Sequence, residues 1–277
     1  MKRVLLLIVI LLVAQCGLQA CHRDYLQQRI EHARFIAVVD FGKLNMSADS
    51  MMERELTIRE ILHGKHDADV LRLRHPWMPD SGCAIVIMDN ETDPVFYIFD
   101  VFPGTKRLYP IASARDLQIY KDRIREYIGI LNEPNKQRRE TATKDWLVRC
   151  AGEQATRSEM YMELLQHDED WQPIKFSRSQ QERLSQVFWS LNTFQLENIG
   201  LCRFVARKDQ PRLKKHLLDK LYNANDKEDA VALAEKILAL YPSKKLQPFV
   251  DELRASDKAT GTGKHQLLVA QFRKTFS

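Results

Sequence analysis

The hydrophobic pattern of the chain changes its period near Pro110, and this change constrains the fold more than any other feature. Before it, short apolar runs alternate with polar residues and stop at Gly, Pro, Asn or Asp, as β-strands do. After it, apolar residues recur at every third or fourth position, as on one face of a helix. The two patterns in succession predict an α+β fold with a β part first and a helical part after it.

The β part is expected to contain five short strands. Apolar runs lie at residues 35–41, 56–61, 70–73, 84–88 and 95–102. Short strands at this spacing are typical of a sandwich or a small antiparallel β-barrel. The apolar stripe from Leu117 to Leu131 predicts a helix that closes this part, with Ser113 as its N-cap and Asp116 three residues later.

The helical part is expected to be a helix-hairpin or bundle domain. Two pairs have the spacing of a capping box, Thr156 with Glu159 and Ser179 with Glu182. Further helices are predicted at residues 213–222, 228–240, 246–255 and 266–272. We therefore expect a signal peptide at 1–20, a barrel domain with its closing helix at 21–131, a linker at 132–140 and a helical domain at 141–277.

The first twenty residues have the pattern of an export signal. Lys2 and Arg3 precede an apolar run of 11 residues, from Val4 to Ala14. This run is short of the roughly 20 residues that a membrane-spanning helix needs. We therefore expect an exported chain, which is periplasmic or anchored in the outer membrane if bacterial and secreted otherwise.

Leu18-Gln19-Ala20-Cys21 resembles the bacterial lipobox, whose cysteine receives diacylglycerol. The resemblance implies a lipid on Cys21 that holds the mature protein at a membrane. Ordinary cleavage after Ala20 is the alternative, although Leu18 suits it poorly.

Four cysteines remain after cleavage: Cys21, Cys83, Cys150 and Cys202. An even set in an oxidising compartment permits two disulfides in three pairings, and we favour Cys150 with Cys202. Lipidation of Cys21 would leave three thiols, of which one stays unpaired. Burial of these cysteines as small apolar residues is the other interpretation.

Residues 21–111 resemble the netrin-like barrel of the tissue inhibitors of metalloproteinases. The order of features carries this resemblance: Cys21 opens the mature chain, a long strand ends at Gly42, another ends at Ile61-Leu62-His63-Gly64, and Gly82-Cys83 precedes a further strand. The resemblance implies a Cys21–Cys83 disulfide and a free amine on Cys21 that chelates the zinc of a protease. The dense cysteine framework of those inhibitors is missing, and acylation of the amine would remove the metal-binding lone pair.

No motif for catalysis, a cofactor or a metal is found in the sequence. Gly-x-Ser-x-Gly and His-Glu-x-x-His do not occur. Residues 261–265 depart from a phosphate loop, and His63 and His66 lie in an expected turn without a complete ligand set. We therefore predict no catalytic residue, no metal and no cofactor.

The candidate binding residues lie at one rim of the expected barrel. Trp77 stands between two prolines, with Arg72 and Arg74 just before it. We expect Trp77 either to pack against the barrel, which we favour, or to be an exposed binding anchor. The formal charge of +5, from 42 Lys and Arg against 37 Asp and Glu, gives no argument for nucleic acid.

These patterns favour an exported, lipid-anchored, non-enzymatic protein-binding or adaptor protein with an unidentified protein partner. The first alternative is a metalloprotease inhibitor that acts through an unlipidated Cys21. The second is an extracytoplasmic enzyme of unrecognised type.

Overall fold

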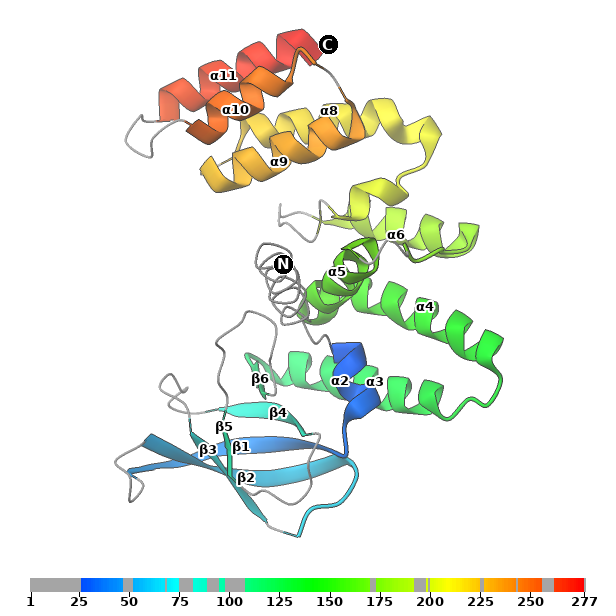
Figure 1. Ribbon diagram of the computed structural model, residues 1–277, viewed down its shortest axis with the longest axis vertical. Coiled ribbons are helices and arrows are strands. Elements are labelled where there is room, and N and C mark those ends of the chain that lie inside the picture. Colours follow the sequence, from blue (N-terminus) through cyan, green and yellow to red (C-terminus); the bar gives the residue numbers. More distant parts are fainter. Residues whose placement is uncertain are drawn as a thin grey trace, which may run out of the picture. The chain divides into compact units, whose positions relative to one another are not determined.

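The computed structural model divides into two compact units, Met1–Ile174 and Lys175–Ser277 (Figure 1). We call them unit 1 and unit 2. The structure describes residues 26–46, 52–67, 69–74, 82–88, 95–97, 108–169, 173–191, 198, 200–224, 227–242, 244–255 and 262–276.

Unit 1 contains a six-stranded sheet. Its strands are β1 (Phe35–Met46), β2 (Met52–His63), β3 (Val70–Arg74), β4 (Cys83–Met88), β5 (Val95–Tyr97) and β6 (Leu108–Ile111). Their order is β5-β3-β2-β1-β4-β6, and every pairing is antiparallel except the parallel one between β3 and β5. Helices follow this sheet, so the predicted α+β class is confirmed. Among the strands that the structure describes, β5 and β6 are open edges.

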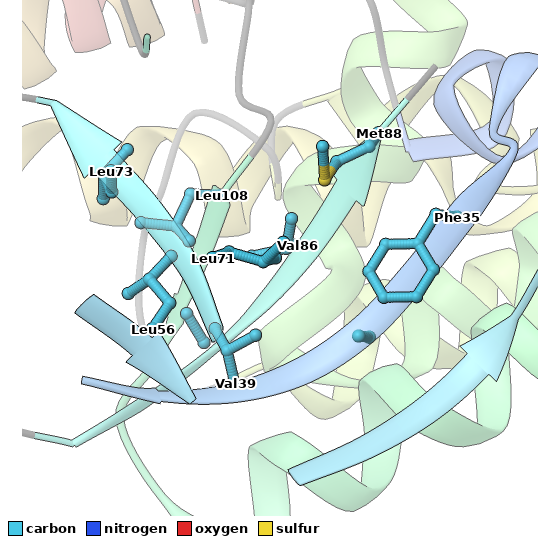
Figure 2. Close-up of a cluster of buried hydrophobic side chains, with 10 residues drawn as sticks. Phe35, Val39, Leu56, Leu71, Leu73, Val86, Met88 and Leu108 are labelled. Atoms are coloured by element: carbon cyan, nitrogen blue, oxygen red, sulfur yellow. The ribbon is translucent and has the colours of Figure 1, made fainter. Parts of the chain in front are cut away.

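A buried apolar cluster covers one face of the sheet, which we call the inner face (Figure 2). The members of this cluster are Phe35, Ala37, Val39, Leu56, Leu71, Leu73, Ala84, Val86, Met88 and Leu108. They alternate along their strands and meet across the ladders, as Leu56 does with Leu71. The opposite face contacts helix α3 (Ala114–Leu131) through β2 and β6.

A β-bulge changes the direction of the side chains near the end of β1. Phe41 pairs with Leu56, but the next pair is Leu44 with Arg54, so Gly42 and Lys43 together lie opposite Glu55. A Cβ on Gly42 would lie 3.1 Å from the carbonyl oxygen of Glu55, which explains why a residue without a side chain occurs at this bulge.

The turn after β2 requires glycine. Gly64 has a φ of +74°, in the left-handed region that other residues rarely adopt. A Cβ at this position would overlap the carbonyl oxygen of Arg34, at the start of β1. Gly64 therefore lets the end of β2 pass close to the beginning of β1.

Among its described residues, unit 1 also contains the four helices α2 (Leu26–His32), α3, α4 (Lys136–Gly152) and α5 (Gln154–Glu169). The predicted cap of α3 is confirmed, because the Ser113 hydroxyl accepts a hydrogen bond from the Asp116 N–H at 3.1 Å. Helix α2 was not expected from the sequence.

The structure differs from the predicted linker at 132–140. A short turn follows α3, and Asn135 then caps α4 by accepting a hydrogen bond from the Arg138 N–H. The basic residues that suggested a linker lie on the exposed first turns of this helix. The division between the two units falls at residues 174 and 175 instead.

Neither predicted capping box is formed by the predicted pair of residues. Helix α5 begins at Gln154, and the Thr156 hydroxyl inside it donates to the Cys150 carbonyl at 3.1 Å. In unit 2, α6 (Arg178–Ser190) is capped by Ser177 with Gln180 as the reciprocal partner, two residues before the predicted pair.

Unit 2 is helical throughout its described residues. After α6 come two short 3-10 helices, η1 (Leu201–Phe204) and η2 (Arg207–Asp209), and then α8 (Gln210–Tyr222), α9 (Lys227–Leu240), α10 (Gln247–Ala255) and α11 (Thr262–Phe276). The last four helices match the four predicted runs and pack as neighbouring antiparallel pairs (Figure 1).

Candidate functional site

The residues predicted at the barrel rim are only partly described. Trp77 and Cys21 lie outside the described residues. Arg72 is an exposed residue of β3, and its Nε lies 3.6 Å from Glu53 Oε1. In the sheet, the backbone of Arg74 lies opposite Glu53 of β2 on one side and opposite Tyr97 of β5 on the other. The grouping of Trp77 with these two arginines stays a prediction.

The three described cysteines, Cys83, Cys150 and Cys202, have free thiols in this structure. Cys150 is buried in unit 1, and burial raises the pKa of its thiol far above the ordinary range. Cys202 is buried in unit 2, where burial raises its thiol pKa to about 12. Because a buried thiol with a raised pKa forms little thiolate, neither group is an activated nucleophile. The Cys150–Cys202 and Cys21–Cys83 disulfides stay predictions.

The described residues contain neither a membrane-spanning helix nor a metal-binding cluster. None of their helices is both long and apolar enough to cross a bilayer. Nor do the described residues include a group of three or more His, Cys, Asp or Glu side chains that could hold a metal ion.

An exposed apolar stripe extends from the core to the end of the β1–β2 hairpin. It consists of Leu44, Met46 and Met52, with exposed fractions of 48%, 67% and 42%. Met46 pairs with Met52, and Leu44 pairs with Arg54, so all three lie on the face of Leu56. We call this set the hairpin stripe. It continues the inner face beyond the point where the core ends.

Arg54 fixes the base of the hairpin stripe. Its side chain lies on the inner face and is 4% exposed. Its Nη1 donates to the Gly42 carbonyl at 2.9 Å, within the bulge of β1. A charge-assisted hydrogen bond to the bulged backbone holds the register that directs Leu44 and Met46 to the inner face. On the opposite face, Asn45 Nδ2 donates to Glu55 Oε1 at 3.2 Å.

A second polar group fixes helix α2, which begins five residues after Cys21. The Tyr127 hydroxyl of α3 donates to Glu31 Oε1 at 2.5 Å. The Leu26 N–H donates to Glu159 Oε2 of α5 at 3.4 Å. Burial and the neighbouring Glu31 carboxylate raise the pKa of Tyr127 well above its usual value, so the phenol stays a donor. These contacts hold the first described helix against α3 and α5.

Sequence reasoning missed two surfaces. The hairpin stripe depends on the bulge, which no sequence pattern marked. The other surface spans residues 203–220, where seven Lys and Arg face only two Asp. A count of charge in short windows, instead of over the whole chain, could have found this second surface.

No protein-family model matches the chain, and no match is found among curated proteins or among solved structures.

Proposed function

We propose that the protein is exported, is held at a membrane by a lipid on Cys21, and binds a partner protein as an adaptor instead of catalysing a reaction. The observation that carries the proposal is the hairpin stripe. Three large apolar side chains on one exposed end of a sheet have the composition of a protein-contact surface. Two of the three are methionines, whose flexible side chains adapt to a partner.

The backbone of β1 supports one mode of binding for this partner. The β4 ladder on β1 ends at Asp40, with one more bond from the Phe41 N–H to the Gly82 carbonyl at 3.0 Å. Residues 42–46 continue as a strand beyond that ladder, and Leu44 and Met46 alternate with polar residues. An extended segment of the partner would add to this edge and cover the hairpin stripe with its own apolar residues.

The position of α2 is consistent with a lipid anchor close to the folded unit. Five residue steps separate Cys21 from Leu26, and a fully extended chain of that length spans roughly 17 Å. Because Leu26 is bound to Glu159, a lipid on Cys21 would keep unit 1 near the bilayer surface.

Mass spectrometry of the mature N-terminus tests the anchor. We expect a chain that begins at Cys21 and carries the mass of diacylglycerol and an acyl group. An unmodified amine with a Cys21–Cys83 disulfide would contradict this and support the inhibitor alternative. Retention of residues 1–20 would contradict export itself.

Photo-crosslinking from the hairpin tests the binding surface. A photoreactive amino acid at position 46 should capture a protein with much higher yield than one at position 45, which lies on the opposite face. The captured protein is then purified and titrated against the chain. Replacement of Leu44, Met46 and Met52 by Gln should weaken this binding by at least about tenfold.

Ile61→Gln provides the matched control. Ile61 is also an exposed apolar residue of β2, with 46% of its surface exposed, but it lies away from the hairpin end. Equal capture from positions 45 and 46, or equal loss of affinity in Ile61→Gln, would contradict a partner site at the hairpin stripe.

We also propose that the sheet closes into a barrel of the netrin-like kind. Strands alone supply the apolar cluster on the inner face among the described residues, as the interior of a small barrel requires. The strand pairings also make β5 and β6 run in the same direction, at the two open edges. Slow hydrogen exchange of edge amides in 95–97 and 108–111 would support closure, and exchange at the rate of open edges would contradict it.

A further inference from the structure

A short segment of unit 2 contains a net charge equal to that of the whole chain. Between Arg203 and Lys220 there are seven Lys and Arg and two Asp, a net charge of +5, and the formal charge of all 277 residues is also +5. The remaining residues therefore balance one another. The excess positive charge of the protein is a local property of η1, η2 and α8.

Five of these cations have exposed side chains: Arg203, Arg207, Lys208, Arg212 and Lys215. The two acids of the segment, Asp209 and Asp219, are half-buried. Helix η2 leads directly into α8, so Lys208 and Arg212 are separated by one helical turn. We call these five residues the basic surface.

Aromatic rings hold two of the arginines in place. The guanidinium of Arg212 lies 4.1 Å from the ring centroid of Trp189, at the end of α6. The guanidinium of Arg203 lies 5.1 Å from the ring of Phe204. Because a cation stacked on an aromatic ring keeps its charge and loses conformational freedom, these contacts present a preformed positive surface.

The α8 terminus adds to this positive potential. The N-cap position, Asp209, makes no side-chain hydrogen bond to the first turn, and Pro211 occupies that turn. The backbone N–H groups at the start of a helix have a partial positive charge. This partial charge lies next to Arg207, Lys208 and Arg212.

We propose that the basic surface binds the anionic headgroups of phospholipids. A protein partner needs an apolar centre to its interface. None of the large apolar side chains that the structure places at the surface lies between residues 203 and 215. A headgroup layer, by contrast, is recognised by clustered Lys and Arg alone. The choice of a membrane rests on the proposed function, in which a lipid holds the chain at a bilayer.

This second attachment has a consequence for the anchor. The lipid proposed on Cys21, diacylglycerol with an acyl group, has several chains and anchors the molecule by itself, and it raises the effective concentration of the basic surface at the bilayer. The lipid on Cys21 belongs to unit 1, whereas the basic surface belongs to unit 2. Both units would therefore be held at the bilayer.

Vesicle co-sedimentation tests the proposal. The chain from residue 21, with Cys21→Ser so that no lipid is attached, keeps every described element. We expect it to bind vesicles of equal parts phosphatidylglycerol and phosphatidylcholine, to release them as salt is added, and not to bind pure phosphatidylcholine. The triple variant Arg207→Gln, Lys208→Gln, Lys215→Gln should bind about 100-fold more weakly.

The matched control is Lys244→Gln, Lys245→Gln, Lys274→Gln. It removes three exposed lysines from the same unit and changes the net charge equally. This control variant should bind the phosphatidylglycerol vesicles with most of the affinity of the unsubstituted chain. An equal loss in both variants would show that net charge alone drives binding and would overturn the inference. Equal binding to pure phosphatidylcholine, or tighter binding to polyglutamate or to an oligonucleotide than to the vesicles, would also overturn it.

The vesicle experiment can succeed or fail independently of the proposed lipid anchor. The sedimented chain has no lipid, so its binding does not depend on modification of Cys21. If vesicles bind but the native N-terminus is unlipidated, the anchor is wrong and the basic surface stands. If the N-terminus is lipidated but vesicles do not bind, only the present inference fails.

Discussion

Charged side chains have different roles in the two units. In unit 1 they join elements: Glu60 of β2 accepts hydrogen bonds from Lys121 at 2.6 Å and Arg125 at 2.5 Å, both on α3. Glu126 of α3 forms an ion pair with Arg149 of α4. Unit 2 also joins two helices by charge, through Arg254 of α10 and Glu235 of α9. It differs from unit 1 in the basic surface, whose five cations are exposed on η1, η2 and α8.

This contrast predicts how far each unit can be altered without unfolding. Helix α8 is held by its buried leucines, such as Leu213, Leu217 and Leu221, and its exposed cations can be replaced without loss of this packing. Unit 1 depends in addition on close backbone approaches and on polar contacts between its sheet and helices. Four substitutions test this contrast and are given in order of decreasing effect.

Gly64→Ala should destabilise unit 1 by about 3 kcal/mol or more, because alanine at a φ of +74° is strained and its Cβ overlaps the Arg34 carbonyl. Hydrogen exchange followed by peptide mass spectrometry reports on each unit separately. We expect lost protection in β1 and β2 and unchanged protection in unit 2. Gly129→Ala is the control, because a Cβ there meets nothing within 4 Å and alanine favours a helix. Protection retained in Gly64→Ala would refute the argument.

Tyr127→Phe should destabilise unit 1 by about 1–2 kcal/mol, because it removes the donor to Glu31. Denaturation in urea measures the change, and exchange of the α2 amides should increase most. Tyr222→Phe is the matched control, since Tyr222 is an exposed residue of unit 2. Equal stability of the two variants would mean that α2 does not depend on this hydrogen bond.

Glu60→Gln should cost about 0.5–1 kcal/mol at neutral pH, since it breaks a half-exposed pair between β2 and α3. The hydrogen bond from Lys121 lowers the pKa of Glu60, so its stabilisation is present above the unfolded pKa and is lost as the pH falls through the folded one. The difference from the wild type should therefore shrink below about pH 4. Urea denaturation across pH measures it. Glu182→Gln is the control in unit 2. It breaks the exposed ion pair between Glu182 and Arg178 and should lower the stability less.

His216→Gln should have the smallest effect: a small loss of stability at every pH, because its ring packs against Phe188 and Trp189, and a weaker pH dependence of unit 2. Burial, together with Lys220 and Arg212, lowers the pKa of His216, while Asp219 opposes this. The folded unit therefore binds fewer protons than the unfolded one, and stability is lost as the pH falls through the unfolded value near about 6.5. Exchange protection of α8, followed from pH 8 to 5 (roughly the range in which histidine titrates), should depend less on pH in the variant. The same substitution at exposed His32 of unit 1 should leave this dependence unchanged.

The fold class and most helices of unit 2 could be predicted, because long amphipathic stripes such as Leu213 to Leu221 leave little ambiguity. Helix α2 could not, since it is short and its apolar positions are few. The first residues of α4 lie within the predicted linker at 132–140, which Pro134 and the basic residues after it suggested, yet a proline just before the Asn135 cap does not interrupt a helix. The residue at which a helix begins is difficult to predict from the nearby polar residues alone, because packing also determines it.

The candidate surfaces were harder to predict than the elements that carry them. Regular alternation from Phe41 places Lys43 and Asn45 on the inner face, and only the bulge reverses this assignment. The basic surface was not predicted, because the formal charge of +5 is a sum over all 277 residues and does not show a local excess. Both failures arise where a local departure from a regular pattern decides what is exposed.

The extra residue in β1 determines which side chains the end of the hairpin places on the inner face. If the strands slipped so that Gly42 and Lys43 each found their own partner, Lys43 and Asn45 would exchange sides with Leu44 and Met46. Leu44 and Met46 would then leave the inner face, and only Met52 of the hairpin stripe would remain there, with no change of sequence. A shift by one position along this ladder would remove most of the exposed apolar surface on which the proposed partner site depends.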